Sequence, residues 1–238
     1  MTANLAGKRP STTVVLAMSA DGKIADVRRD RARFSSGSDR THLEKQVSQA
    51  DGVLFGAGTL RAYGTTLSVS NPELLTLRLQ CGKSPQPVQI VCSSLGDLDP
   101  EWRFFRQPVP RWLLTTDAGA RRWEGRAEFE RVLVVEATRE GFNWIAAFAQ
   151  FSELGLQNLA VLGGGELVAS LFAVDLIDEL RLTVCPMILG GATAPTPVEG
   201  SGFLPDLAPR LELLSVHTIE QEVFLHYRRQ RDPANLQL

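Results

Sequence analysis

The sequence predicts a single α/β domain of three layers, in which a mostly parallel mixed sheet has helices on both faces and ends in an antiparallel hairpin. Short apolar runs alternate with helical segments over the first two thirds of the chain, the pattern of βαβ units. The last third has strand-like runs with no helix between the final two. No repeat, low-complexity tract or long linker divides the 238 residues. We therefore expect one domain over residues 12–228, with flexible tails at 1–11 and 229–238.

Strands are expected where short apolar runs stand between polar or glycine-containing segments. These runs cover residues 13–18, 53–55, 88–92, 112–115, 132–135, 159–162, 180–185, 211–218 and 223–228. Helices are expected between strands at 38–49, 71–80 and 142–154. The segment TIEQE at 218–222 is typical of a turn, so we expect the last two strands to form the antiparallel hairpin.

The composition is that of a soluble globular protein with a substantial core, since 44% of the residues are hydrophobic and 22% are charged. A net charge of −2 does not indicate a nucleic-acid or membrane-surface partner. Cys81, Cys92 and Cys185 are far apart and lack CxxC spacing, which argues against disulfides and a zinc site. The apolar run at 13–20 is too short to span a bilayer and has no cleavage pattern after it. We expect a cytoplasmic protein without a metal site.

Two glycine turns follow apolar runs. VLGGGELVASLF, residues 161–172, places Gly163, Gly164 and Gly165 before a segment of helical spacing, and VLFGAGTLRA, residues 53–62, repeats the arrangement. Glycines in succession cost backbone entropy, so a close approach of another group is expected there. A helix N-terminus preceded by glycines suits a phosphate or pyrophosphate, although many such turns bind nothing. Neither turn has the GxGxxG spacing of an ordinary Rossmann domain.

Four segments, in this order, resemble the reductase domain of riboflavin biosynthesis. They are AMSADGKIAD (17–26), SSGSDRTHLEKQVSQADGVLFGAGT (35–59), LAVLGGGELVASLF (159–172) and LIDELRLTVCPMILGG (176–191). That family is the 5-amino-6-(5-phosphoribosylamino)uracil reductases, which share the dihydrofolate-reductase-like fold. The resemblance implies NADPH as the hydride donor and a ribosylamino-pyrimidine phosphate as the substrate. The hydride would be transferred to the ring-opened sugar imine.

The resemblance also implies a homodimer. The apolar block LRLTVCPMIL, residues 180–189, is long for a strand inside one small domain. The block fits a subunit interface, and it also fits a central strand buried on both faces.

The cofactor site that the resemblance implies lies at the two glycine turns. Its residues are Ala17, Gly58, Thr59, Ser93, Gly163, Gly164, Gly165, Glu166 and Leu167. Residues 164–170 would form the pyrophosphate loop and the first helical turn, and the Ala17 backbone would lie on the nicotinamide side. Ser93 follows the strand VQIVC, where the family often meets the adenosine 2′-phosphate. A serine in that place is also a common turn former.

Asp21 is the candidate catalytic residue. It is typical of a plain β-turn before Gly22, but the resemblance favours a carboxyl beside the nicotinamide that positions water or helps to protonate the sugar imine. Ser36 and Arg78 are the implied substrate-binding residues, and Arg78 also fits a solvated helix position. The segment HLE at 42–44 matches half of a zinc deaminase signature, but the chain has no PCxxC. Deaminase activity is therefore not expected.

The substrate side departs from the family pattern at three positions. Leu162 stands where the family often has an acid, Val47 where a basic residue is expected, and Tyr63 at an aligned acidic position. These departures leave two alternatives open beside the riboflavin reductase. One is a dihydrofolate-reductase-like enzyme with another substrate, and the other is a non-catalytic NADPH-binding homologue.

Overall fold

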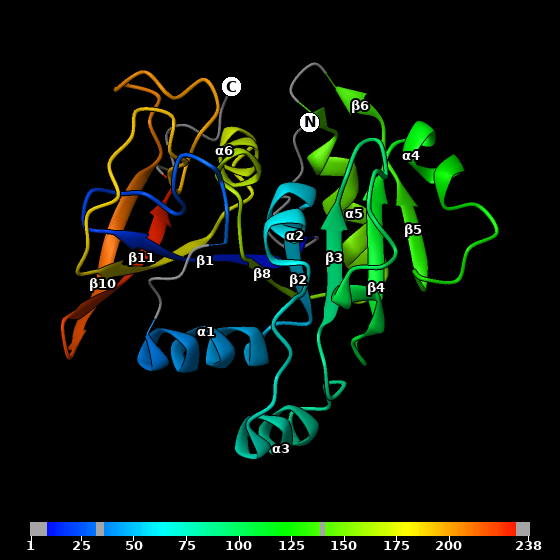
Figure 1. Cartoon of the computed structure of the whole chain (residues 1–238), viewed down its shortest axis with the longest axis horizontal. Helices are drawn as coiled ribbons and strands as arrows, with labels where there is room; N and C mark the ends of the chain where they lie inside the picture. The colour runs from blue at the N-terminus through cyan, green and yellow to red at the C-terminus, as the bar shows by residue number, and fades with distance from the viewer. Residues whose placement is uncertain (1–8, 32–35, 139–140, 232–238) are drawn as a thin grey trace.

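The computed structural model describes residues 9–31, 36–138 and 141–231. Within these ranges one sheet runs in the order β10-β11-β9-β1-β8-β2-β3-β4-β5 (Figure 1). Its strands are β1 (Ser11–Ser19), β2 (Gly52–Gly56), β3 (Val88–Cys92), β4 (Arg111–Thr115), β5 (Arg131–Val134), β8 (Asn158–Val161), β9 (Glu179–Cys185), β10 (Arg210–Ile219) and β11 (Glu222–Gln230). The short strands β6 (Ala137–Thr138) and β7 (Gly141–Phe142) pair separately.

The helices connect these strands. They are α1 (Gly37–Gln49), α2 (Ala57–Tyr63), α3 (Pro72–Gln80), α4 (Asp117–Arg122), α5 (Trp144–Glu153) and α6 (Gly165–Ala173), with a 3-10 turn at Arg103–Arg106. Each predicted helix and strand is present with ends within two residues of those expected. The helix α4 and the β6–β7 pair were not predicted. No helix in the described ranges is long and apolar enough to cross a bilayer.

The strand directions confirm the predicted mixed sheet. Strands β9, β1, β8, β2, β3, β4 and β5 are mutually parallel. The C-terminal strands β10 and β11 form an antiparallel hairpin, and β11 pairs antiparallel with β9. The chain therefore has the expected α/β class with a C-terminal hairpin.

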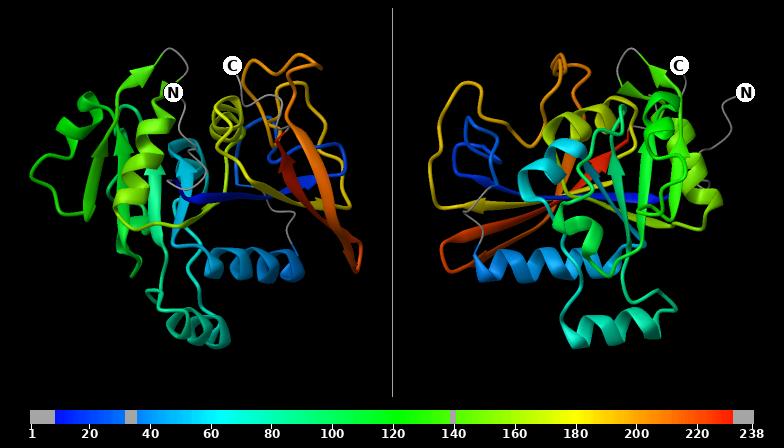
Figure 2. Two further views of the ribbon diagram at one scale, coloured as in Figure 1. Left: turned by 180° about the vertical axis from the view of Figure 1, so that it is seen from behind. Right: turned by 45° about the vertical axis from the view of Figure 1, so that its right-hand side comes forward.

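Helices cover both faces of the sheet because alternate side chains of each strand are apolar on opposite sides. Val14 and Leu16 of β1 pack in one core with α5 and α6. Val53 and Phe55 of β2 pack in a second core with side chains of α1 and α2. Val47 of α1 belongs to this second core. Figure 2 shows α1 and α6 on opposite sides of the strands. The three-layer prediction is confirmed.

Polar side chains cap the helices where the chain leaves the sheet. The Ser36 hydroxyl accepts a hydrogen bond from the Asp39 N–H at the start of α1. Asn71 caps α3 in the same way ahead of Pro72, and Asn143 caps α5. These caps satisfy N–H groups that have no partner inside a helix.

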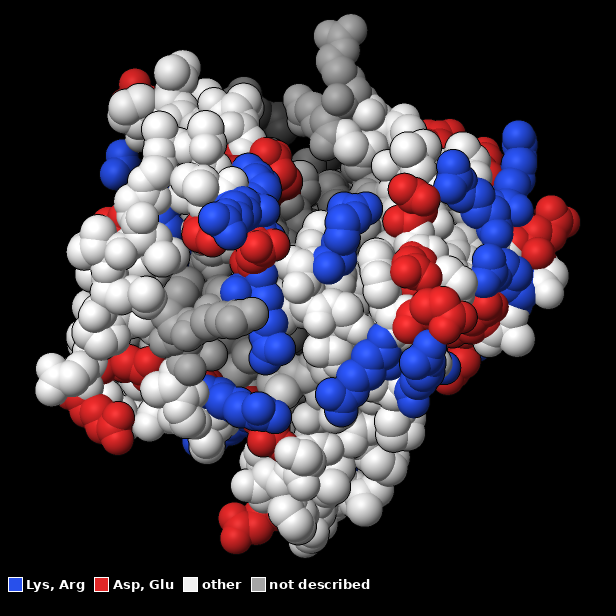
Figure 3. Space-filling model, viewed as in Figure 1, with Lys and Arg blue, Asp and Glu red and all other residues white. Residues whose placement is uncertain are grey.

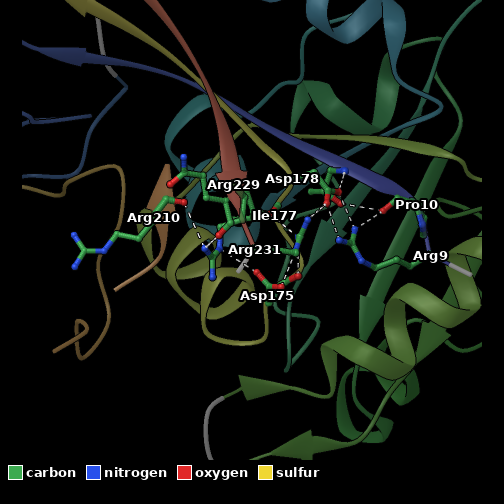
Figure 4. Close-up of polar contacts among 10 residues, drawn as sticks. Arg9, Pro10, Asp175, Ile177, Asp178, Arg210, Arg229 and Arg231 are labelled. Atoms are coloured by element: carbon green, nitrogen blue, oxygen red, sulfur yellow. Dashed lines mark hydrogen bonds and ion pairs between the residues drawn. The ribbon is translucent and has the colours of Figure 1, made fainter. Parts of the chain in front are cut away.

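An ion network joins the two ends of the fold (Figure 4). Arg9 forms a two-pronged pair with Asp178 at 2.7 and 2.8 Å, and Arg231 binds both Asp178 and Asp175. Burial opposes ionisation of Asp178, but the hydrogen bond from Arg9 and the nearby charges lower its pKa overall. Residues on either side of the expected boundaries at 12 and 228 thus take part in the fold, since β1 begins at Ser11 and β11 ends at Gln230.

Candidate active site

A cavity of about 520 Å³ opens at the carboxyl ends of β1, β2 and β8. Ligands of α/β sheets bind beyond this edge because the connections diverge there and leave a crevice. Leu16, Ala17, Phe55 and Leu162 provide apolar walls near the strand ends. In the space-filling view, basic and acidic side chains meet around a hollow near the middle of the molecule (Figure 3).

The three consecutive glycines have three different reasons to be glycine. Gly163 has a φ of +107°, which disfavours any side chain. A Cβ on Gly165 would lie 2.3 Å from the Thr196 carbonyl oxygen, so this glycine is required by packing. A Cβ on Gly164 would meet only the Thr59 hydroxyl, at 3.7 Å, and Gly164 lines the cavity. Gly164 is thus the member of the triplet whose missing side chain leaves the cavity open.

Most of the expected cofactor residues line this main cavity. They are Ala17, Gly58, Thr59, Gly163, Gly164, Gly165, Glu166 and Leu167. Ser93 lies elsewhere, in a second cavity of about 530 Å³. The two cavities share Gly56, Glu166, Leu167 and Glu199, so together they extend from the end of β1 to the end of β3.

Trp144 lines the second cavity, and its indole nitrogen is buried beneath the surface. Trp144 is 5% exposed, and its indole N–H has no hydrogen-bond acceptor among the residues that the structure describes. A buried donor of this kind is costly unless a ligand or water accepts from it. The two adjoining cavities and the open face at Gly164 fit a dinucleotide.

Asp21 lies outside the residues that line either cavity. Its carboxylate accepts hydrogen bonds from the Ser19 hydroxyl and from the N–H groups of Leu189 and Gly190, at 2.6, 3.1 and 2.7 Å. The Ser19 contact, with the backbone donors, lowers the pKa of Asp21 to about 2. A carboxyl that is ionised at neutral pH has no proton to donate, so the structure does not support the expected acid role. Asp21 instead fastens the turn after β1 to the segment after β9.

Arg78 is not at the cavity either, which corrects the expected phosphate role. Its side chain is 3% exposed and donates to the carbonyl oxygens of Ser48 and Ala50, both at 2.7 Å, and of Ser84 at 2.9 Å. Nor is it a solvated helix residue, because these carbonyls bury the guanidinium. Ser36 also does not line the cavity, since its hydroxyl caps α1 and donates to Glu222 at 2.6 Å.

The basic residues among the described cavity lining are Arg29 and Arg31. Arg29 forms an ion pair with Glu199 at 2.7 Å, and the Arg31 guanidinium lies 5.7 Å from the centre of the Tyr63 ring. Sequence reasoning missed both arginines, because they lie in a charged, irregular segment with no periodicity.

Asp39 is a third residue that sequence reasoning missed. It lies in the first turn of α1, lines the cavity and is only 5% exposed. Burial, and then the charge of Glu222, raise the pKa of Asp39, while a hydrogen bond from Thr183 acts in the opposite direction. The sequence did contain one sign that Asp39 faces the core: Asp39, Leu43 and Val47 are spaced four residues apart. That spacing places the carboxyl on the same helix face as the apolar side chains.

Comparisons with known proteins identify the family of the chain. The family model of the RibD C-terminal domain matches residues 10–225. A protein from Archaeoglobus fulgidus named 2,5-diamino-6-ribosylamino-4(3H)-pyrimidinone 5′-phosphate reductase is 32% identical over 197 residues, which is 82% of this chain and 89% of that protein.

Solved structures share the fold at low identity. A pyrimidine reductase-like protein from Corynebacterium diphtheriae superposes with a TM-score of 0.79 at 18% identity, covering 97% of this chain and 96% of that one. Dihydrofolate reductase from Enterococcus faecalis, solved with NADP(H), gives a TM-score of 0.51 at 12% identity, covering 93% and 97% of the two chains. The fold is therefore dihydrofolate-reductase-like, as predicted. The family match over residues 10–225 shows that the chain belongs to the RibD C-terminal domain family.

Proposed function

We propose that the protein is an NADPH-dependent reductase that acts on a ribosylamino-pyrimidine phosphate in riboflavin biosynthesis. The observation that carries the proposal is the pair of cavities that meet at the two glycine turns, in a chain of this family. The Archaeoglobus relative is named as the reductase of such a compound.

The cofactor would lie across both cavities. Gly164 and the start of α6 would hold the pyrophosphate, because the N–H groups at a helix N-terminus favour an anion. Thr59 faces the same turn, and its hydroxyl is the nearest group to a Cβ built on Gly164. Ser93, which lines the second cavity, would meet the adenosine half. The nicotinamide would lie near Ala17.

NADPH supplies the hydride when it is bound. The acceptor is the imine carbon of the ring-opened sugar. The imine nitrogen would take a proton from solvent before the hydride adds, so the C=N π bond breaks as the new C–H bond forms and a neutral amine results. Leu16, Phe55 and Leu162 would exclude water from this step, because they form an apolar wall at the strand ends. The apolar residue at 162, a departure from the family pattern, is compatible with that role.

The phosphate of the substrate would be bound by arginine. Arg31 is exposed, lines the main cavity and has no ion pair among the described contacts. Arg29 is already paired with Glu199. A guanidinium suits a phosphate because its fork of N–H donors matches the phosphate oxygens. Arg31 takes the place that sequence reasoning gave to Arg78.

A homodimer in the cytoplasm is part of the proposal. The block at 180–185 is a central strand, since β9 pairs with both β1 and β11. The interface is instead proposed at β10, an edge strand of the sheet in the described part of the chain, on which Leu213, Val216 and Ile219 are exposed. All three cysteines are free, which agrees with a reducing compartment.

The proposed function is tested by the loss of NADPH absorbance with purified protein. The substrates are 2,5-diamino-6-ribosylamino-4(3H)-pyrimidinone 5′-phosphate, 5-amino-6-(5-phosphoribosylamino)uracil and dihydrofolate. Turnover of either pyrimidine supports the proposal. Turnover of dihydrofolate alone would assign another substrate, and tight NADPH binding without any turnover would indicate a non-catalytic homologue.

A further inference from the structure

Two carboxylates lie where the two cavities meet. The residues that line both cavities are Gly56, Glu166, Leu167 and Glu199. A dinucleotide that spans both cavities has its pyrophosphate at this junction, because the pyrophosphate joins the nicotinamide half to the adenosine half. Two glutamates beside two phosphate groups repel them, since like charges at short range raise the energy of the site. The junction therefore needs a cation when a dinucleotide is bound.

Arg29 is the basic side chain that the structure connects to this junction. Its Nη2 atom donates to Oε1 of Glu199 at 2.7 Å. Arg31, the other arginine of the described cavity lining, lies over the ring of Tyr63, which lines the main cavity and is not among the described residues of the second. The two arginines thus serve different parts of the site.

Glu199 is fixed against the start of α6. Its N–H donates to the Gly165 carbonyl oxygen at 3.1 Å, and its Oε2 lies 2.9 Å from the position that a Cβ on Gly165 would take. The Glu199 side chain is 15% exposed, whereas the Arg29 side chain is 57% exposed. A largely buried carboxylate therefore holds an exposed guanidinium beside the glycine turn.

The Arg29 guanidinium can contact Glu199 and a phosphate at the same time. A guanidinium has several N–H donors in a rigid fork, and among the contacts of the described residues Glu199 accepts from Nη2. The fork matches phosphate oxygens as well as carboxylate oxygens. Glu199 can therefore stay in place when a phosphate binds, and the positive charge of Arg29 offsets its negative charge.

We propose that Arg29 binds the pyrophosphate of the nicotinamide dinucleotide, and that Glu199 is the positioning residue that holds the Arg29 guanidinium at the junction of the two cavities. This inference rests on the proposed function. It adds a charged side chain to a cofactor site that is otherwise formed by the backbone of the glycine turns and the Thr59 hydroxyl. It also accounts for a carboxylate at the point where the cofactor is most negative.

The experiment measures the affinities of NADPH and NADH by fluorescence titration in wild type and in Arg29→Gln. The two dinucleotides share the pyrophosphate and differ in the 2′-phosphate. Arg29→Gln should lower both affinities by the same factor, about 10-fold to 100-fold, the size expected when a hydrogen bond to a charged group is lost. Unchanged affinities would overturn the proposal, and so would a loss confined to NADPH, which would assign Arg29 to the 2′-phosphate.

Arg28→Gln is the matched control for this measurement. Arg28 is exposed in the same segment and is not among the described residues that line either cavity. The control should keep both affinities. An equal loss in Arg28→Gln would show that the charge of the whole segment, and not a contact of Arg29, attracts the dinucleotide, and this would overturn the proposal.

A double variant tests the role of Glu199. In Arg29→Gln the Glu199 carboxylate lacks the charge that offsets it, so it repels the pyrophosphate. Adding Glu199→Gln to Arg29→Gln should therefore recover part of the lost affinity. A double variant that binds NADPH no better than Arg29→Gln would overturn the positioning role. Thermal unfolding of each variant checks that the titrations are done on folded protein.

Turnover measured beside binding separates this inference from the proposed function. Wild-type affinity in Arg29→Gln, in a protein that reduces either pyrimidine, would overturn the role of Arg29 and leave the reductase function standing. Weakened dinucleotide binding in Arg29→Gln, with no turnover by wild type, would support the role of Arg29 and overturn the reductase function. A wild type that binds neither NADPH nor NADH would overturn both.

Discussion

The backbone N–H of Gly56 donates to the carbonyl oxygen of Gly163 at 3.1 Å, and this hydrogen bond joins the two glycine turns side by side. Gly56 ends β2, and Gly163 follows β8, the neighbour of β2 in the sheet. The contact aligns the starts of α2 and α6 along one edge of the sheet. Both cavities are lined by residues of each turn. The hydrogen bond between Gly56 and Gly163 therefore fixes the surface on which a dinucleotide would lie.

Gly164→Val is expected to weaken NADPH binding while the fold is kept. Gly164 has an extended φ of −87°, which valine readily adopts, and its Cβ position is in ordinary contact with Thr59. Overpacking costs about 1–3 kcal/mol, so the affinity should fall about 10-fold to 100-fold. Fluorescence titration of NADPH measures the affinity, and thermal unfolding checks the fold.

Gly165→Val is the matched control for that prediction. Its Cβ would overlap the Thr196 carbonyl oxygen and the Glu199 side chain, so it should lower the unfolding temperature strongly. If a folded Gly164→Val protein bound NADPH with the affinity of wild type, the glycine triplet would serve chain packing alone and would not contact the cofactor.

Arg31→Gln is expected to lower kcat/KM for the phosphorylated substrate by about 10-fold to 100-fold. A hydrogen bond to a charged group contributes about 1.5–3 kcal/mol, which corresponds to that range. The affinity for NADPH and the kcat/KM for the dephosphorylated substrate should change little. Arg28→Gln is the control, because Arg28 is exposed in the same segment and does not line the cavity. Equal losses with both substrates would show that Arg31 does not bind the phosphate.

The fold could be predicted from the sequence because its signals are local. Apolar runs such as 88–92 and turn segments such as 218–222 determine where strands begin and end, and the structure has them there. The two glycine turns could also be recognised in the sequence, because each places glycines between an apolar run and a helical segment.

The polar residues of the site could not be predicted as well, because their roles depend on contacts distant in sequence. Arg78 was expected at a phosphate, but its donors are used by carbonyls of residues 48, 50 and 84. Asp21 follows β1 as expected, but its carboxylate accepts hydrogen bonds from the N–H groups of residues 189 and 190, and Asp21 does not line the cavity. Asp39 was missed because only the packing of α1 on the sheet buries its side chain at the cavity.

Asp21→Asn is expected to lower stability in a way that depends on pH. The folded pKa of Asp21 is about 2, below the ordinary value of 3.8, so ionisation stabilises the folded state above pH 3.8. This stabilisation is lost as the pH falls through 3.8 toward 2. The difference in unfolding temperature between wild type and variant should therefore be constant near neutral pH and shrink on acidification.

Thermal unfolding at a series of pH values measures that difference. The pH profile of kcat near neutrality should be the same in wild type and Asp21→Asn, since Asp21 is ionised throughout that range. A changed profile there would restore the catalytic role for Asp21. A difference in unfolding temperature that is the same at every pH would show that the carboxylate charge is not what the turn requires.

Val216→Lys is expected to convert a dimer into a monomer. Val216 is 49% exposed on the edge strand β10, so lysine fits the monomer, whereas a charge at an apolar interface has to be desolvated. Sedimentation at micromolar concentration should give twice the chain mass for wild type and the single chain mass for the variant. Leu77→Lys is the control, because Leu77 is similarly exposed on α3, away from β10 (Figure 1). A wild type that sediments only as a monomer would remove the proposed dimer, and a Val216→Lys protein that remains dimeric would move the interface to another surface.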